Sequence, residues 1–136
     1  MNRLPGHIAS VETHGSMALV DAAVGAHRLT AMLIGAGAEV AAWRAGMPVT
    51  LLFKEAEVSL AKNLSGLISM RNRLPAAVTA IERGKLLTKV MLDFDGHVIA
   101  SIITTRSSNA LSLAVGDMVE ALVKANEMSV LPETAA

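Results

Sequence analysis

The chain repeats itself at a constant spacing of 70 residues. Asn2 aligns with Asn72, and the match continues to the end of the first copy without a gap. The identical pairs at this spacing are Asn2/Asn72, Arg3/Arg73, Leu4/Leu74, Pro5/Pro75, Glu12/Glu82, Val20/Val90, His27/His97, Gly46/Gly116, Val49/Val119, Leu52/Leu122, Lys54/Lys124, Glu57/Glu127 and Ser59/Ser129. A period this long exceeds that of the common solenoid repeats and is typical of two small tandem domains.

Two small domains in 136 residues are each near the lower limit for a self-sufficient core. Apolar residues make up 52% of the chain, so we expect apolar surface to be buried between the copies or between chains. The sequence therefore predicts a homo-oligomer, a dimer or trimer of the tandem unit.

Charge and cysteine content exclude several classes of protein. The net charge is zero, so no overall field attracts nucleic acid, and the absence of cysteine excludes disulfides and thiolate metal sites. The charge-free apolar run 29–38 is about half the roughly 20 residues that a membrane helix needs, and no signal peptide opens the chain. We predict a cytoplasmic location and no membrane span.

Alternating apolar runs between turn residues indicate five short strands in each copy. The strands are expected at 4–12, 17–24, 28–34, 49–54 and 57–60, and at 77–82, 86–94, 97–104, 118–124 and 128–131. Short helices are expected at 38–45 and, capped by Ser107 or Ser108, up to Leu113. This count predicts an all-β chain of two tandem OB-like five-stranded barrels, each with one short helix, over residues 1–62 and 68–132.

Two stretches offer the groups that an oxyanion requires. One is Ser69-Met70-Arg71-Asn72 before the second barrel, and the other is Lys124-Ala125-Asn126 after its fourth strand. A guanidinium fork, an ammonium and hydroxyl or backbone donors can replace the hydration shell of a tetrahedral dianion. From the residues alone, an Arg and a Lys in a small barrel are more often solvated surface charges.

These two stretches also resemble a known family. Ser69-Met70-Arg71-Asn72, followed about fifty residues later by the segment 115–128, is similar to the molybdate-binding Mop domain of the TOBE superfamily. That family opens Ser-Ala-Arg-Asn and closes with a Gly-Asp-x-Val and Lys-Ala-Ser pattern. The resemblance implies an OB-like barrel that binds molybdate or tungstate at interfaces between subunits, with no organic cofactor. Carried onto this chain, it implies the ligands Ser69, Met70 backbone, Arg71, Lys124, Ala125 backbone and Asn126.

The first copy departs from this pattern. It lacks the Ser-x-Arg opening, and Glu55 follows Lys54 where a small residue is expected. A carboxylate at that position would repel an oxyanion. The second copy is therefore predicted to hold the better site, with Lys54 a weaker contributor.

The function predicted from these features is oxyanion binding without catalysis, for cytoplasmic storage, homeostasis or sensing of molybdate. The alternative is the effector-binding C-terminal fragment of a molybdate-responsive transcription regulator or of a molybdate transporter's ATPase subunit.

A nucleic-acid module is disfavoured because the chain has one Trp, two Phe and no Tyr to stack bases. An enzyme is disfavoured because no nucleophile, base and orienting group form a set. His27 and His97 lack ligand spacing, so no metal site is predicted. A purely structural oligomerisation module is the remaining class.

Overall fold

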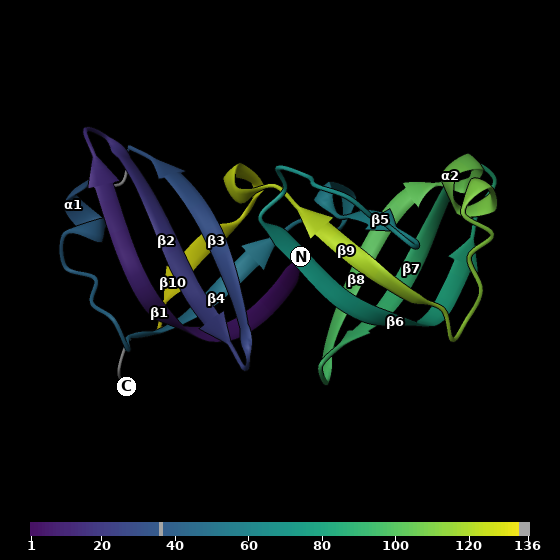
Figure 1. Ribbon diagram of the computed structural model, residues 1–136, viewed down its shortest axis with the longest axis horizontal. Helices are drawn as coiled ribbons and strands as arrows, with labels where there is room; N and C mark the ends of the chain where they lie inside the picture. The colour runs from purple at the N-terminus through teal and green to yellow at the C-terminus, as the bar shows by residue number, and fades with distance from the viewer. Residues whose placement is uncertain (36, 134–136) are drawn as a thin grey trace.

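The computed structural model describes residues 1–35 and 37–133. Figure 1 shows two lobes side by side, each built on a curved antiparallel sheet. The first repeat contains β1 (Asn2–His14), β2 (Met17–Val24), β3 (His27–Ile34), α1 (Gly37–Val40), β4 (Pro48–Phe53), the 3-10 turn η1 (Glu55–Glu57) and β5 (Ser59–Ala61). The second contains β6 (Asn72–Arg83), β7 (Leu87–Phe94), β8 (His97–Thr104), α2 (Thr105–Ala110), β9 (Met118–Val123), the 3-10 turn η2 (Ala125–Glu127) and β10 (Ser129–Pro132). The predicted all-β fold of two five-stranded units is confirmed.

The helices differ in detail from the sequence prediction. The first ends at Val40 rather than at residue 45. In the second, the Thr104 hydroxyl accepts a hydrogen bond from the backbone N–H of Ser107 at 3.1 Å, so α2 begins at Thr105. The prediction of Ser107 or Ser108 as the cap is therefore wrong. Ser108 is instead buried within the helix.

Each sheet takes its fifth strand from the other repeat. The strand orders are β10-β4-β1-β2-β3 and β5-β9-β6-β7-β8. β10 pairs with β4 in the first barrel, with Val130 opposite Leu51, and β5 pairs with β9 in the second, with Leu60 opposite Ala121. In Figure 1 the yellow β10 accordingly lies among the purple and blue strands. Each repeat has five strands as predicted, but its fifth strand completes the sheet of the other repeat, and the boundaries 1–62 and 68–132 stay a prediction for the repeat units.

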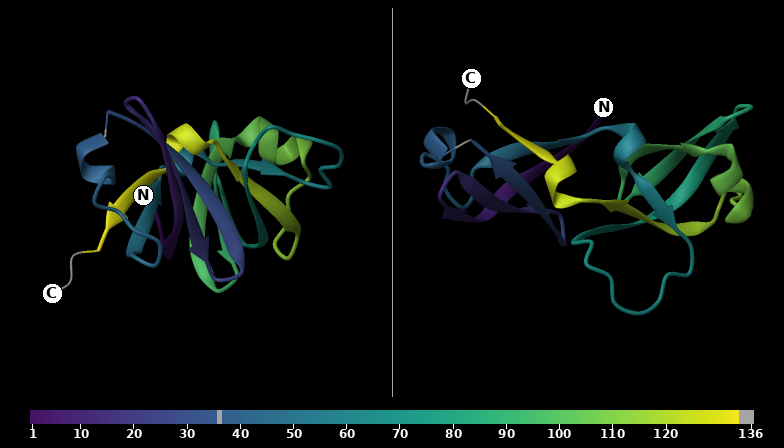
Figure 2. Two further views of the ribbon diagram at one scale, coloured as in Figure 1. Left: turned by 60° about the vertical axis from the view of Figure 1, so that its left-hand side comes forward. Right: turned by 90° about the horizontal axis from the view of Figure 1, so that it is seen from above.

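The connections after β4 and β9 explain this exchange. Each is a single 3-10 turn between residues with extended backbone, Lys54 and Val58 in the first repeat and Lys124 and Met128 in the second. A hairpin back onto β4 would need a tight reversal of the kind that Asn-Gly or Gly-rich pairs form, and residues 54–58 contain no glycine. The chain therefore runs onward from one barrel to the other. Figure 2 shows both crossings lying between the two lobes.

Reciprocal asparagines lock the two barrels together. Asn72 donates from Nδ2 to the Thr30 carbonyl at 2.8 Å and accepts from the Thr30 N–H at 2.7 Å. Asn2 makes the same pair of bonds with Ala100, at 2.9 and 2.8 Å. Both amides are buried, and each sits in one barrel while its partner strand, β3 or β8, belongs to the other. The buried apolar side chains of both barrels likewise form one continuous cluster.

No helix among residues 1–35 and 37–133 combines the length and the apolar character needed to cross a membrane.

Candidate functional site

A hollow of about 500 Å³ lies at the junction of the two barrels. We call it the junction hollow. Its lining residues are Met32, Ile68, Ser69, Met70, Arg71, Lys124, Ala125 and Asn126. Six of these are the residues predicted from the sequence as oxyanion ligands. The structure thus brings together two stretches that are more than fifty residues apart in the chain.

The clamp at Asn72 fixes the first of these stretches. Arg71 precedes Asn72 directly, and the Asn72 amide is held on the backbone of β3 by its two hydrogen bonds to Thr30. Met32 lies two residues further along the same strand and enters the lining from the first barrel. The same contact therefore places Arg71 beside β3 and closes one wall of the junction hollow.

The turn η2 supplies the second stretch. Lys124 stands immediately before it with extended backbone, and the carbonyl of Lys124 accepts the N–H of Glu127 at 3.0 Å. Met128, at the end of the turn, is buried in the core and contacts the Asn72 amide through its sulfur at 4.0 Å. Both stretches are thus anchored on Asn72, which gives the junction hollow a defined geometry.

The charge of the junction hollow is positive. No carboxylate is among its lining residues. Among the residues that the structure describes, neither Arg71 nor Lys124 takes part in an ion pair within 4.0 Å, whereas the neighbouring Arg73 forms a two-bond pair with Glu120 at 2.6 and 2.8 Å. Two cations next to the apolar side chains of Met32 and Ile68 favour an anionic guest, since part of the wall cannot hydrate them.

Lys54 lies away from the junction hollow and does not line it. It precedes η1, the first-repeat counterpart of η2. There the carboxylate of Glu55 lies 3.5 Å from the amino nitrogen of Met1 and 3.7 Å from Nζ of Lys89. The sequence argument that a carboxylate follows Lys54 is matched by a local ion-pair network, but the relative weight of Lys54 in binding stays a prediction.

Sequence reasoning missed three residues of the site. Met32 and Ile68 line the junction hollow without being predicted, and Asn72 belongs to the opening motif but was not predicted to have a role. Met32 could not have been found, because nothing in the sequence shows that β3 of one repeat faces η2 of the other. Asn72 could have been found from the sequence. Asparagine is depleted in strands, yet it recurs at the start of the first strand of each repeat, as Asn2 and Asn72.

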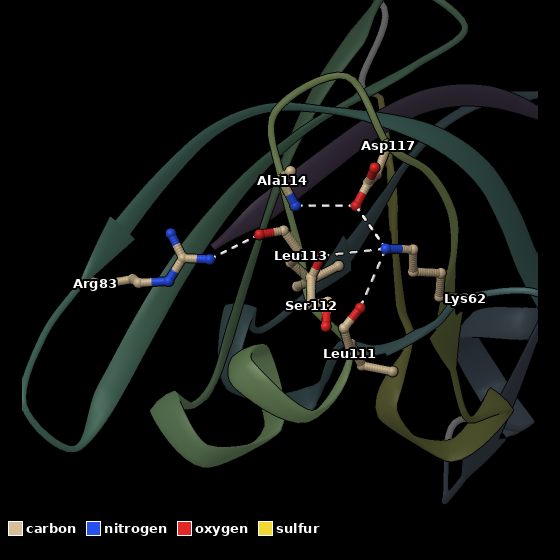
Figure 3. A network of polar contacts seen from close by, with 7 residues as sticks. All are labelled: Lys62, Arg83, Leu111, Ser112, Leu113, Ala114 and Asp117. Atoms are coloured by element: carbon tan, nitrogen blue, oxygen red, sulfur yellow. Dashed lines mark hydrogen bonds and ion pairs between the residues drawn. The ribbon is translucent and has the colours of Figure 1, made fainter.

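A second polar cluster holds the connection between the repeats. Figure 3 shows Nζ of Lys62 donating to the carbonyls of Leu111 and Ser112, each at 3.1 Å, and to the Asp117 carboxylate at 2.9 Å. Hydrogen bonds from Lys62 and from the Ala114 N–H hold the pKa of Asp117 below its usual value. The network ties the start of the segment 62–71 to the second barrel. Ser69 and Arg71 lie at the other end of that segment.

The described residues contain no group of three or more histidine, cysteine, aspartate or glutamate side chains placed to hold a metal ion.

Comparison with known proteins adds a family and a structural neighbour. A family model described as TOBE domain matches residues 1–60 and again residues 68–130. The molybdenum import ATP-binding protein ModC of Brucella abortus (strain 2308) is 46% identical over 80 residues, which is 58% of this chain and 22% of that protein. The molybdenum-pterin-binding protein MopA of Rhodobacter capsulatus is 33% identical over 123 residues, which is 89% of this chain and 45% of that protein. The chain thus spans less than half the length of either relative.

The chain is also similar to a solved structure over nearly its whole length. This is the cytoplasmic molybdate-binding protein ModG in a form with molybdate bound. The TM-score is 0.89 and the sequence identity 28%, over 96% of this chain and 94% of the other.

Proposed function

Because this chain belongs to the TOBE domain family, with one matching domain in each repeat, we propose that it binds molybdate or tungstate in the junction hollow. The observation that carries this proposal is that all six residues predicted as ligands line one hollow that contains two cations and no carboxylate. The similarity to a protein with molybdate bound supports the same ligand.

The chemistry of the lining suits a tetrahedral dianion. Arg71 can offer two parallel N–H donors and Lys124 a compact ammonium, while the Ser69 hydroxyl, the Asn126 amide and the backbone N–H groups of Met70 and Ala125 add neutral donors. If four charge-assisted bonds each contribute about 1.5–3 kcal/mol, the gross term covers micromolar binding after the costs of ordering. Such a site needs no general acid or base, so the proposed role is binding without catalysis.

We propose storage or homeostasis of the oxyanion in the cytoplasm as the role of this binding. The chain matches a cytoplasmic molybdate-binding protein along 94% of that protein's length but only 22% of the ATP-binding import protein. The similarity to a cytoplasmic molybdate-binding protein supports the storage role, and an effector-binding part of a molybdate-responsive regulator or transporter is the alternative. A homo-oligomer that covers the open side of the junction hollow would complete the coordination, as predicted from the apolar composition.

Isothermal titration with molybdate, tungstate, sulfate and phosphate tests the proposal, with the mass of the assembly measured in parallel. We expect tight binding of the two metal oxyanions and weak binding of sulfate and phosphate, since a larger dianion loses less hydration energy on burial. The absence of tight molybdate binding by the folded protein would refute the proposed function.

A further inference from the structure

The two barrels meet at two equivalent junctions. Two corresponding residues differ between these junctions, and the two differences have complementary charge. In one, η2 packs on β3, and in the other, η1 packs on β8. At the spacing of 70 residues, Ala125 of η2 corresponds to Glu55 of η1, and Met32 of β3 corresponds to Ile102 of β8. We call the place where η1 meets β8 the first-repeat junction.

A second residue difference between the repeats accompanies that between Ala125 and Glu55. Leu19 lies opposite Met32 on the neighbouring strand β2, and the corresponding position opposite Ile102 on β7 is Lys89. Ala125, which lines the junction hollow, and Leu19, which lies opposite its lining residue Met32, therefore correspond to a carboxylate and an ammonium at the first-repeat junction. The replacements are complementary in charge.

The side chains that result are in contact. Oε2 of Glu55 lies 3.7 Å from Nζ of Lys89, although the two residues belong to different barrels. The other oxygen, Oε1, lies 3.5 Å from the amino nitrogen of Met1, the residue that corresponds to Arg71. The carboxylate thus lies between the amino group of Met1, the counterpart of Arg71, and Lys89, the counterpart of Leu19 on the strand next to Met32.

We infer that Glu55 is a built-in anion that occupies the first-repeat junction, and that Lys54 and Lys89 form a latent second oxyanion site that Glu55 keeps closed. This inference rests on the proposed function of the junction hollow. Lys89 and the Met1 amino group stand in for the missing guanidinium beside Lys54. Among the described residues, the Glu55 carboxylate lies against Lys89 and the Met1 amino group, whereas no carboxylate lines the junction hollow.

The inference predicts the number of oxyanions that each chain binds. Through the junction hollow, the wild-type protein binds one molybdate per chain. Replacing Glu55 by Ala or by the isosteric, neutral Gln adds a second one, with affinity roughly tenfold weaker because two lysines lack the planar fork of Arg71. Molybdenum per chain, measured by elemental analysis after equilibrium dialysis, gives this number directly. Glu57→Ala, on the same turn, is the matched control and keeps one per chain.

The reverse change tests the same idea at the other junction. Ala125→Glu places a carboxylate beside Arg71 and Lys124, and we expect it to abolish molybdate binding, while Ala125→Gln retains most of it. The double variant Glu55→Ala with Ala125→Glu keeps only the weaker, newly opened site, so its remaining binding disappears when Lys89→Ala is added.

The outcomes separate the two proposals. If the folded wild-type protein binds no molybdate, the proposed function fails and this inference with it. If the wild-type protein binds one per chain and the folded Glu55→Ala and Glu55→Gln variants also bind only one, the proposed function stands and the built-in anion is refuted. Circular dichroism of each variant establishes that it is folded.

Discussion

The two 3-10 turns that follow the fourth strands have nearly the same backbone and different surroundings. Lys54 and Lys124 both precede their turn in an extended conformation, with φ and ψ of −75° and 145° in one and −65° and 145° in the other. Around Lys124 there are Arg71 and a hollow without carboxylates, whereas next to Lys54 the Glu55 carboxylate faces Lys89. The fold therefore depends on what the repeats share, and binding on the few side chains in which they differ.

The largest effect that separates the repeats should come from removing β10. Deleting residues 129–136 removes a strand of the second repeat, yet it strips the edge of β4 in the first barrel. We expect the free energy of unfolding to fall by about 4 kcal/mol or more, as for the most severe single changes. Hydrogen exchange should show that the amides of β4 lose protection before those of β9. Loss that starts in β9 would contradict the exchanged topology.

The asparagine clamps should give the next largest effect. Asn2→Ala leaves the N–H and carbonyl of the buried Ala100 without a partner, and Asn72→Ala leaves those of the half-buried Thr30. We expect each change to lower the free energy of unfolding by about 2–4 kcal/mol. Urea denaturation measures this cost, with the exposed Asn109→Ala as control. Only Asn72→Ala should also weaken molybdate binding, because Asn72 alone adjoins the junction hollow. Equal losses of affinity in both variants would show that the clamps act on the fold as a whole.

Removing single cations should show how much each repeat contributes to the affinity for molybdate. Arg71→Ala and Lys124→Ala are each expected to weaken molybdate binding about 10- to 150-fold, the equivalent of about 1.5–3 kcal/mol for a charge-assisted bond. Lys54→Ala should change the affinity by less than about threefold. Calorimetric titration compares the three, with Arg106→Ala on α2, which does not line the junction hollow, as a control. Equal losses at Lys54 and Lys124 would contradict the inequality of the repeats.

The smallest effect is the acid sensitivity of the second barrel. Hydrogen bonds from Arg73 hold the pKa of Glu120 below its usual value, and those from Lys62 and the Ala114 N–H do the same for Asp117. A carboxyl whose pKa is lower in the folded state stabilises the fold above its unfolded pKa, and this stability is lost as the pH falls through the folded pKa. The first repeat has Thr50 and Met47 at these two positions.

The second barrel should therefore lose stability before the first one when the pH is lowered below about 4. Hydrogen exchange at decreasing pH should show increased opening in β6 and β9 before β1 and β4. Glu120→Thr, which copies the first repeat, should reduce the acid-induced loss measured by denaturation. A first barrel that opens earlier would contradict the assignment of these ion pairs.

The strands could be predicted from the sequence because their signals are local. The bounds of β2 and β8 were predicted to the residue, since turn residues such as Asp95-Gly96 mark where a hairpin reverses. The six expected ligands also line one hollow, because their two stretches lie directly before β6 and directly after β9.

The partner of each fifth strand could not be predicted. The first residues of β5 and β10, Ser59 and Ser129, are identical, and each strand is only three or four residues long. The pattern of either strand fits the edge of either sheet equally well. The same limit hid Met32, because its place in the junction hollow depends on a contact between repeats. Contacts across a pseudo-symmetric interface leave no periodicity in the sequence.

The exchanged fifth strands have a consequence for how such a chain can diverge. A half-length version with one repeat could complete its barrel only by trading strands with a second molecule, at a rate and stability set by its concentration. Covalent linkage makes that trade intramolecular and permanent. After duplication, one copy can then lose its ligand residues to mutation and still be retained by selection, because the other copy cannot fold without the strand that it lends.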